Sequence, residues 1–481
     1  MATFHIENFG CRATWADAAA IARQFSQRGY ARAGHSAAAD VLVLNTCTVT
    51  ADADAGARQA IRRAHRANPS ARIVVTGCYA QRAPEELAAI TGVSLVVGNS
   101  HLTEIAALCE ARGHSPAREN GGASLAFGEL SVNEPLHSTG FVPLTAFNGE
   151  AALRSPSHVA AVIAGDIFAR KELALADAAW GDEACRTRPV LKIQDGCDQR
   201  CAYCVIPFVR GRSRSLAPAG VVAEVQRLVA GGAKEIVLSG INLGSYGRDL
   251  APRSDASGRH AGLIEVLRRI LDKTSLERLR LSSIEPMDVT RDLLDLFAST
   301  DRLARHFHIP LQSGSDRLLR AMHRWYKAAH YAQRVKLVRE LLPGAGIGAD
   351  VIAGFPGETD EDHRATMELI AALPFTYLHV FSFSSRPGTE AARLLEQERA
   401  PQVPPAVVKQ RVHELRALAA AQAAAFRAAH AGHTLRALTL HTKGEDARGP
   451  WTDAICDNYL KVRVPGHQPA NQWRHVALDR K

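Results

Sequence analysis

Three cysteines, Cys197, Cys201 and Cys204, lie within eight residues at the spacing C-x3-C-x2-C, directly after the apolar run 190–193. Thiolates at this spacing can hold three corners of a [4Fe-4S] cluster and leave one iron open to a small molecule. A structural zinc site would close with a fourth Cys or His nearby, but residues 205–211 contain neither. Because free cysteines of a core have no reason to cluster so closely, the loop predicts a cluster with an open iron.

The composition restricts the class of protein. A chain of 481 residues exceeds a single core, and 46% hydrophobic with 22% charged residues is typical of a globular soluble protein. It has no apolar run long enough to span a bilayer and no signal-peptide pattern, so we expect no membrane association. Nine cysteines that group by motif indicate reduced thiols and a cytoplasmic location. The formal charge of +9 permits a polyanionic partner, although an Arg-rich composition explains it equally well.

Strand-like and helix-like stretches alternate in the N-terminal third, which predicts a doubly wound parallel α/β sheet. The expected strands are 3–8, 41–44 and 73–76, and the expected helices are 17–28 and 53–66. Cys11, Cys47 and Cys78 each follow the carboxyl end of one of these strands. Because such ends meet at one edge of a parallel sheet, we expect the three thiols to converge and hold a second cluster. The alternative is three separate buried cysteines.

Glycines and prolines interrupt the pattern between residues 113 and 187, and only 159–172 has helical character. We interpret this segment as a linker or insertion. Cys109 and Cys185, near its edges, belong to no motif and are interpreted as ordinary cysteines. The predicted domain organisation is therefore 1–112, 113–187, 188–415 and 416–481.

The central region alternates in the same way after the cysteine loop. Together with 190–193, the expected strands are 234–240, 278–283, 306–311, 347–352 and 377–383. Six β/α units make a partial barrel with its chemistry at the carboxyl ends of the strands. The residues there that we expect to contact a cofactor are Gly240, Asn242, Ser283, Glu285 and Gln312. Tyr203, between two of the cysteines, is expected to pack on an adenine or to shield the cluster from water.

Over nearly its whole length the chain resembles a methylthiotransferase of the radical S-adenosylmethionine (SAM) superfamily. The stretches that carry the resemblance are 45–50, 75–81, 196–211, 308–316 and 354–358. Within that family the chain is most similar to the tRNA threonylcarbamoyladenosine methylthiotransferases, at 192–197, 240–247 and 375–381.

The resemblance implies that Cys197, Cys201 and Cys204 hold the cluster that binds and cleaves SAM, and that the other three cysteines hold an auxiliary [4Fe-4S] cluster. It implies transfer of a methylthio group to C2 of N6-threonylcarbamoyladenosine at position 37 of tRNA, with two SAM molecules. A low-potential electron donor such as flavodoxin or ferredoxin is implied as a further partner. The chain departs from the family at Thr14, where an Asn is usual, which is expected to alter hydrogen bonds around the auxiliary cluster.

The C-terminal part begins with an Ala-rich helix over 406–431 and continues with short strands at 435–441 and 459–464, which predict a small β-barrel. It resembles a TRAM domain, an RNA-binding module. The residues expected to contact RNA phosphates are Lys443, Arg448, Lys461, Arg463 and Arg474, and the rings expected to stack on bases are Trp451, Tyr459 and Trp473. A solvated basic face with structural aromatics is the alternative.

Three other functions compete with this interpretation. The same chemistry on N6-isopentenyladenosine is the nearest, and methylthiolation of an aspartate in a ribosomal protein is the second. The third is a non-catalytic iron–sulfur protein that binds RNA and senses redox state. It predicts that the reduced, reconstituted protein does not cleave SAM.

Overall fold

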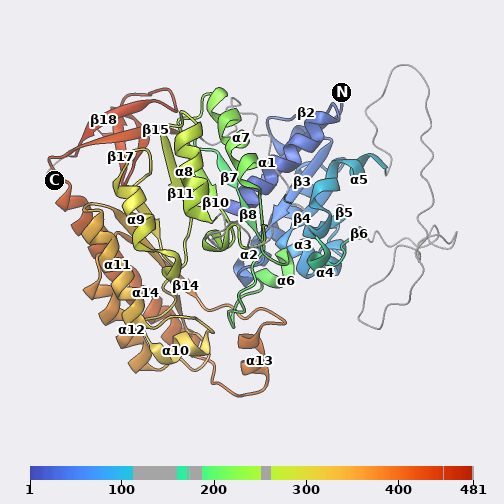
Figure 1. Cartoon of the computed structure of the whole chain (residues 1–481). Coiled ribbons are helices and arrows are strands. Elements are labelled where there is room, and N and C mark those ends of the chain that lie inside the picture. Colours follow the sequence, from blue (N-terminus) through green and yellow to red (C-terminus); the bar gives the residue numbers. More distant parts are fainter. Residues whose placement is uncertain (112–159, 171–172, 174–186, 251–261, 448, 479–481) are drawn as a thin grey trace.

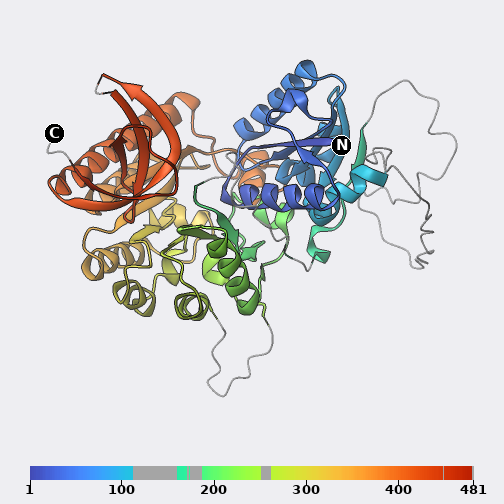
Figure 2. The same ribbon diagram turned by 90° about the horizontal axis from the view of Figure 1, so that it is seen from above.

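The computed structural model describes residues 1–111, 160–170, 173, 187–250, 262–447 and 449–478. Within these residues the chain forms an N-terminal α/β domain, a central partial barrel and a C-terminal antiparallel sheet (Figures 1 and 2). The fold class expected from the sequence is therefore confirmed.

The N-terminal domain is a parallel sheet of six strands with helices on both faces. The strands lie in the order β2 (Ala31–Arg32), β1 (Thr3–Asn8), β3 (Val41–Thr46), β4 (Arg72–Gly77), β5 (Val93–Gly98) and β6 (Ala161–Ile163). Alternate residues of β3 face opposite sides. Leu42 and Leu44 pack with Ile61 of α2 (Ala51–Ala67), whereas Val41 and Val43 pack with Ile21 of α1 (Arg12–Gln27). This two-sided burial is why β3 is apolar at four successive positions.

The helical character predicted for residues 159–172 is wrong. Ala161–Ile163 is strand β6 at the edge of the N-terminal sheet, and only Ile167–Ala169 forms a short 3-10 helix. β6 pairs in parallel with β5, Leu95 opposite Ala161, and β5 itself was not predicted. A strand of three residues carries too little periodicity to be recognised, and its place depends on a partner more than sixty residues away.

The central domain confirms all six predicted strands. They are β7 (Val190–Lys192), β10 (Glu235–Ser239), β11 (Arg278–Leu281), β12 (His306–His308), β13 (Gly346–Ala353) and β14 (Tyr377–Ser382). β7, β10 and β11 form one parallel sheet and β12, β13 and β14 another. The isolated parallel bridges Leu279–Leu303 and Ser283–His308 link the two. The six strands thus follow one another in chain order, as a partial barrel requires.

The helices between the strands bury the outer face of this barrel in one large apolar core. They are α7 (Pro218–Ala230), α8 (Leu263–Lys273), α9 (Arg291–Ala298), α11 (Ala328–Leu341) and α12 (Asp360–Ala372). Phe307, Ile347, Ala349 and Val351 belong to that core. Because side chains alternate along a strand, the residues between them face the barrel interior.

The N-terminal domain contacts both ends of the open barrel. Helix α1 lies against β7, the first barrel strand. On the other side, Arg386, which follows the last strand, donates from Nη1 to Asp54 Oδ2 at 2.5 Å, and the Ala51 amide donates to Ser384 Oγ at 2.9 Å. Figure 2 shows the N-terminal domain beside the barrel.

The C-terminal part comprises α14 (Pro405–Ala429) and an antiparallel sheet in the order β17 (Lys461–Pro465), β16 (Gly449–Cys456), β15 (Thr434–Asp446) and β18 (Trp473–Ala477). It docks on the amino-terminal end of the barrel strands. Arg280 of β11 donates to the carbonyl oxygens of Cys456 at 2.8 Å and Asp457 at 2.7 Å. Glu235 of β10 lies beside Arg280 and is fully buried, so ionised groups line the base of the barrel.

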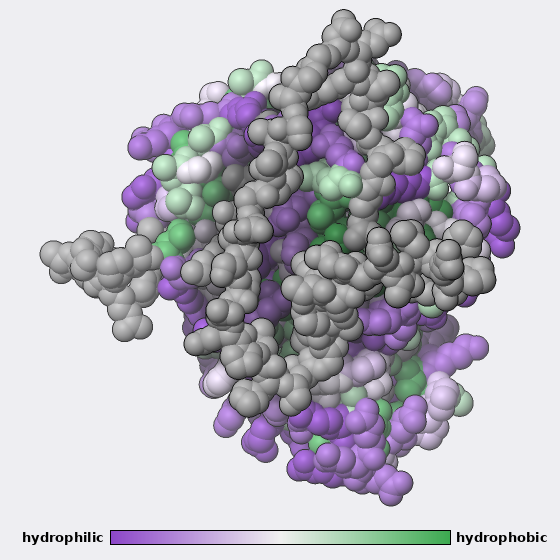
Figure 3. Space-filling model, turned by 90° about the vertical axis from the view of Figure 1, so that its right-hand side faces the viewer, coloured by the Kyte–Doolittle hydropathy of each residue, from purple (hydrophilic) through white to green (hydrophobic). Residues whose placement is uncertain are grey.

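The surface in Figure 3 carries mainly hydrophilic residues where the described part of the chain is visible, with apolar residues scattered among them. None of the helices in the described residues combines the length and the apolar character that crossing a bilayer requires.

Candidate active site

The first cysteine triad lies at the carboxyl ends of three adjacent strands. Cys11 precedes α1, Cys47 follows β3, and Cys78 begins α3 (Cys78–Arg82) directly after β4. The thiols are close enough to influence one another electrostatically. Burial raises the pKa of Cys47 to about 12, and the nearby Cys78 and Cys11 add to the rise. The three cysteines therefore converge at one edge of the sheet, as the sequence predicts.

Two glycines make this convergence possible. Gly10 has φ +131°, and a Cβ atom there would lie 2.7 Å from Cys47 Cβ. Gly77 has φ +100°, and a Cβ atom there would lie 2.3 Å from the carbonyl oxygen of Thr46. An L-side chain rarely adopts these backbone angles and would collide at both positions. Only glycine lets the chain present Cys11 and Cys78 beside Cys47.

The second triad lies in the loop after β7. Gly196 begins the loop with φ +72°, and a Cβ atom there would lie 1.9 Å from the carbonyl oxygen of Arg212. The Cys197 amide donates to the Gly211 oxygen at 3.0 Å, which closes the loop. Burial raises the pKa of Cys204 to about 12, with Cys201 and Cys197 adding to it.

The geometry of both triads fits an iron–sulfur cluster better than a single ion. Among the described His, Cys, Asp and Glu side chains, only His308, Asp350 and His379 gather three potential ligand atoms within 4.8 Å of one another. The cysteine triads are wider than that. Thiolates on separate irons of a cube lie further apart than thiolates on one ion, and three of them leave one iron without a protein ligand.

A cavity of about 450 Å³ adjoins the second triad at the carboxyl ends of the barrel strands. This volume suits a cofactor-sized ligand. Its lining includes Asn242 and Glu285, two of the predicted cofactor contacts. Asn242 Oδ1 is buried and has no hydrogen-bond partner. A buried oxygen without a hydrogen-bond partner is costly, and Asn242 belongs to the lining of the cavity, so the residues present fit a small polar cofactor such as SAM.

The other predicted cofactor contacts do not line this cavity. Gly240 packs against Gln194, because a Cβ atom there would lie 2.8 Å from Gln194 Oε1. Ser283 is exposed and bridges to β12. Gln312 is buried with φ +68°, and its backbone amide donates to the backbone carbonyl oxygen of Asp350 at 2.8 Å. Tyr203 packs in a small apolar cluster with Met322 and Phe355.

Arg324 was missed by the sequence analysis. Its Nη1 donates to Cys201 Sγ at 3.3 Å and its Nη2 pairs with Glu285, while the ring of Tyr326 lies 5.1 Å from its guanidinium. The neighbouring Trp325 lines the same cavity with 79% of its surface exposed. No motif marks Arg324, because it reaches Cys201 from 123 residues away in the chain.

A buried network of charges joins the two triads across the domain interface. Arg210, from α6 (Ile206–Arg210), donates to Asp17 Oδ2 at 2.8 Å and to Asp195 Oδ1 at 3.1 Å. Lys192 pairs with both carboxylates. Burial raises the pKa of Cys78, and the nearby guanidinium of Arg210 opposes that rise. Charges this deeply buried persist only when paired, so the network fixes how the two domains meet.

The two triads are neighbours as a result. Cys78 of the first packs in one apolar cluster with Val205 and Val209, and Val205 directly follows Cys204 of the second. The side-chain amide of Asn99 adds a hydrogen bond from Nδ2 to Cys78 Sγ at 3.6 Å.

The predicted RNA contacts are dispersed over the C-terminal sheet. Lys443, Lys461 and Arg463 are exposed. Arg463 pairs with Asp446 at 2.8 Å and covers the Trp451 ring at 3.9 Å. Arg474 is half-buried and donates to Gln468 Oε1 at 3.0 Å. Arg448 lies outside the described residues.

Two of the aromatic rings predicted to stack on bases are engaged within the protein. Trp473 donates from Nε1 to Glu277 Oε2 at 2.7 Å and lies under the guanidinium of Arg436 at 3.8 Å. Tyr459 enters the base of the barrel, where its ring stacks on His306 at 4.3 Å. Both rings dock the C-terminal sheet onto the central domain.

Comparisons with known proteins agree with this architecture. Residues 3–98 match the model described as "Uncharacterized protein family UPF0004", and residues 191–370 match the radical SAM superfamily. The chain is 34% identical over 472 residues to the threonylcarbamoyladenosine tRNA methylthiotransferase MtaB of Aquifex aeolicus, covering 98% of this chain and 99% of the relative. The chain belongs to the radical SAM tRNA methylthiotransferase family. The cofactors of this family are SAM and two [4Fe-4S] clusters.

Further relatives lie within the same family. The tRNA-2-methylthio-N(6)-dimethylallyladenosine synthase of Sphingopyxis alaskensis is 33% identical, with 96% of this chain and 92% of the relative covered. The radical SAM methyltransferase TsrM of Kitasatospora setae, solved with cobalamin and a [4Fe-4S] cluster, has a TM-score of 0.54 at 17% identity. That alignment covers 84% of this chain and 80% of TsrM, and it supports the fold alone.

Proposed function

We propose that this methylthiotransferase adds a methylthio group to C2 of N6-threonylcarbamoyladenosine at position 37 of tRNA. The observation that carries the proposal is the contact of Cys78 with Val205 and Val209, which places the two cysteine triads side by side across the domain interface. A centre that activates the substrate and a centre that delivers sulfur must lie close to the same base. Two triads held this close meet that requirement.

Each triad would hold one cluster. Cys197, Cys201 and Cys204 would bind the cluster whose open iron chelates SAM, and the first triad would bind the auxiliary cluster. When bound, these groups supply the radical and sulfur chemistry that an unactivated adenine carbon needs.

The residues around the SAM cavity would bind and orient the cofactor. Asn242 Oδ1 accepts a hydrogen bond from a donor of SAM, and Glu285 accepts from ribose hydroxyls. Arg324 connects Cys201 with Glu285, so it ties the position of the cluster to that of the cofactor. Tyr326 and Trp325 line the same cavity.

tRNA and an electron donor are the proposed partners, and the cytoplasm the proposed location. Exposed Lys443 and Lys461 of the C-terminal sheet would contact phosphates, and the chain as a whole carries +9. A small flavodoxin or ferredoxin would supply the electron. Both partners bind proteins of this charge through opposite charges on their surfaces.

The function is tested by mass spectrometry of tRNA nucleosides from cells with and without this chain, and after complementation. We expect 2-methylthio-N6-threonylcarbamoyladenosine to disappear on deletion and to return on complementation. Loss of a methylthiolated dimethylallyladenosine instead would assign the chain to the synthase branch of the family. An unchanged nucleoside profile, together with a lost methylthioaspartate in a ribosomal protein, would overturn the tRNA assignment. An RNA-binding redox sensor would change neither product.

A further inference from the structure

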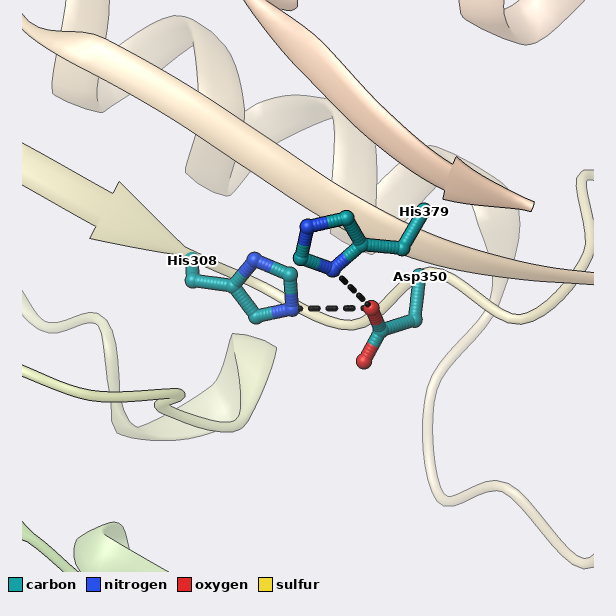
Figure 4. A group of neighbouring side chains, drawn as sticks. All are labelled: His308, Asp350 and His379. Carbon is teal, nitrogen blue, oxygen red and sulfur yellow. Dashed lines mark hydrogen bonds and ion pairs between the residues drawn. The ribbon is translucent and has the colours of Figure 1, made fainter. Parts of the chain in front are cut away.

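Three polar side chains from neighbouring strands meet inside the barrel (Figure 4). His308 comes from the end of β12, Asp350 from the middle of β13 and His379 from β14. His308 Nε2 and His379 Nδ1 lie 3.0 Å and 3.1 Å from the same oxygen, Asp350 Oδ1. The second carboxylate oxygen points away from both imidazoles (Figure 4). The predicted function assigns no role to this group.

The group continues inward as a chain of hydrogen bonds. The Tyr377 hydroxyl lies 3.1 Å from His308 Nδ1 and 2.8 Å from His306 Nε2. Gly348 leaves the room for this ring, because a Cβ atom there would lie 2.0 Å from Tyr377 Cζ. A strand glycine with an aromatic ring on its open face indicates that the barrel interior is shaped around the polar chain.

This row of hydrogen-bonded side chains is exposed to solvent at the His379 end and buried at the His306 end. The side chain of His379 is 55% exposed, that of Asp350 26% and that of His308 6%. Phe381, two residues along β14 on the same face, is 43% exposed, and its ring meets that of His379 edge-on at 6.4 Å. An exposed aromatic ring beside exposed polar groups suits a nucleobase, which stacks through its face and hydrogen-bonds through its edge.

The group is connected to the SAM cavity and to the N-terminal domain. Burial raises the pKa of Glu285 in the SAM cavity, and the negative charge of Asp350 contributes to that rise, so the two carboxylates are within electrostatic range. Arg12, which directly follows Cys11, donates from Nη2 to the Tyr459 hydroxyl at 3.4 Å. The ring of Tyr459 stacks on His306 at the buried end of the group. Asp350 therefore lies within electrostatic range of the SAM cavity, and the buried end of the hydrogen-bonded side chains lies near Arg12 of the N-terminal domain.

We propose that His308, Asp350 and His379 form the subsite that binds the polar N6 substituent of the substrate adenosine. The inference rests on the proposed function and adds how the enzyme selects its substrate. A threonylcarbamoyl group carries a hydroxyl, urea N–H groups and a carboxylate. The second oxygen of Asp350 accepts from a hydroxyl or N–H, and Nε2 of the exposed His379 ring, in its protonated form, donates to the carboxylate.

An apolar dimethylallyl group makes none of these hydrogen bonds. Placed here, it would remove water from Asp350 and both imidazoles without replacing the lost hydrogen bonds. Sites built to hydrogen-bond a substituent reject analogues that lack it far more strongly than apolar pockets reject a polar isostere. The subsite thus explains a preference for a polar substituent.

Two imidazoles and a carboxylate are also a ligand set for zinc. Here one nitrogen of each imidazole, His308 Nε2 and His379 Nδ1, already points at Asp350 Oδ1, so the three groups satisfy one another without an ion. Hydrogen bonds to His308 and His379 also outweigh burial and hold the pKa of Asp350 well below its usual range. The arrangement is that of a hydrogen-bonded anion.

The test compares His379→Leu and Asp350→Asn with wild type in the reconstituted full chain. The substrates are anticodon stem-loops that carry threonylcarbamoyladenosine or dimethylallyladenosine. We expect kcat/KM on the threonylcarbamoyl stem-loop to fall about 10- to 100-fold, the loss of one or two hydrogen bonds to charged groups. The ratio of kcat/KM on the threonylcarbamoyl stem-loop to kcat/KM on the dimethylallyl stem-loop should fall by the same factor. His330→Leu, on the exposed side of α11, is the matched control and should change neither.

Iron content should stay at the wild-type value in both variants, because neither residue is a cysteine ligand, and SAM cleavage without RNA should stay at the wild-type value in His379→Leu, because His379 does not line the SAM cavity. If wild type acts on the threonylcarbamoyl stem-loop and His379→Leu keeps both rate and preference, the subsite is wrong and the proposed function stands. If wild type does not act on that stem-loop, both are wrong. One equivalent of zinc retained by wild type and lost in Asp350→Asn would also overturn the subsite.

Discussion

Arg210 of the central domain donates a hydrogen bond from Nη2 to Asp17 Oδ2 of the N-terminal domain at 2.8 Å, and neither side chain is more than 1% exposed. Lys192 and Asp195 complete the pairing on the central side. Removing one partner from such a network leaves a charge buried without compensation. The docking of the two domains, and with it the spacing of the two triads, therefore depends on these charges.

Asp17→Asn should lower the thermal unfolding midpoint markedly, because it leaves Arg210 and Lys192 with one carboxylate. The free energy of unfolding is expected to fall by about 3–5 kcal/mol, as for other broken buried ion pairs. Differential scanning calorimetry measures it. Asp295→Asn removes the partner of an exposed pair, Arg291–Asp295 at 3.8 Å, and should leave the midpoint unchanged. Equal midpoints for the two variants would show that the buried network does not hold the domains together.

Cys47→Ala should halve the iron content of the reconstituted protein, from about eight to about four atoms per chain. Cys201→Ala should lose the other half and abolish SAM cleavage as well. Cys109→Ala changes a buried cysteine outside both triads and should retain all the iron. Iron and sulfide analysis with a SAM cleavage assay measures these outcomes. Full iron in Cys47→Ala would rule out the auxiliary site.

Gly77→Ala should remove the auxiliary cluster without touching a cysteine. The added Cβ would lie 2.3 Å from the Thr46 oxygen at φ +100°, so Cys78 must move. We expect about four irons per chain and unchanged SAM cleavage without RNA. Gly29→Ala is matched to it, since Gly29 has φ +81° with nothing within 4 Å of the added Cβ. It should keep about eight irons. Iron loss in both variants would point to general strain instead.

Glu235→Gln should destabilise the protein at neutral pH and have little effect in acid. Burial acts to raise the pKa of Glu235, but Arg280, Arg278 and Arg188 outweigh it and hold the pKa well below its usual value. A carboxylate with a depressed pKa stabilises the fold above its unfolded pKa of about 4.3, and this stabilisation is lost as the pH falls below it.

The denaturant midpoints of wild type and Glu235→Gln should therefore differ at pH 7 and approach each other as the pH falls below about 4. Chemical denaturation followed by circular dichroism measures both midpoints. Glu265→Gln is the control, because Glu265 forms an exposed pair with Arg269 at 2.8 Å. A constant difference between wild type and Glu235→Gln across the pH range would contradict the assignment of Glu235 as ionised in the folded state.

The six barrel strands, the strands β1, β3 and β4 of the N-terminal sheet and the cysteine positions were predictable because they depend on local pattern. The run Val41–Leu44 is apolar at every position since β3 is buried on both faces, and the strands of the barrel end where the chain becomes polar or glycine-rich. Cys11, Cys47 and Cys78 could be placed at one edge because parallel strands share their carboxyl ends.

The sequence by itself thus determined the order of the domains, the two triads and the family to which the chain belongs. Only the tertiary structure decided what lies between the triads. Arg210 meets Asp17 across 193 residues, and Arg324 reaches Cys201 across 123. His308, Asp350 and His379 come together only because β12, β13 and β14 pair in one register. Periodicity records which face of a strand is buried, but side chains from distant segments meet only once strand pairing and domain docking have placed them.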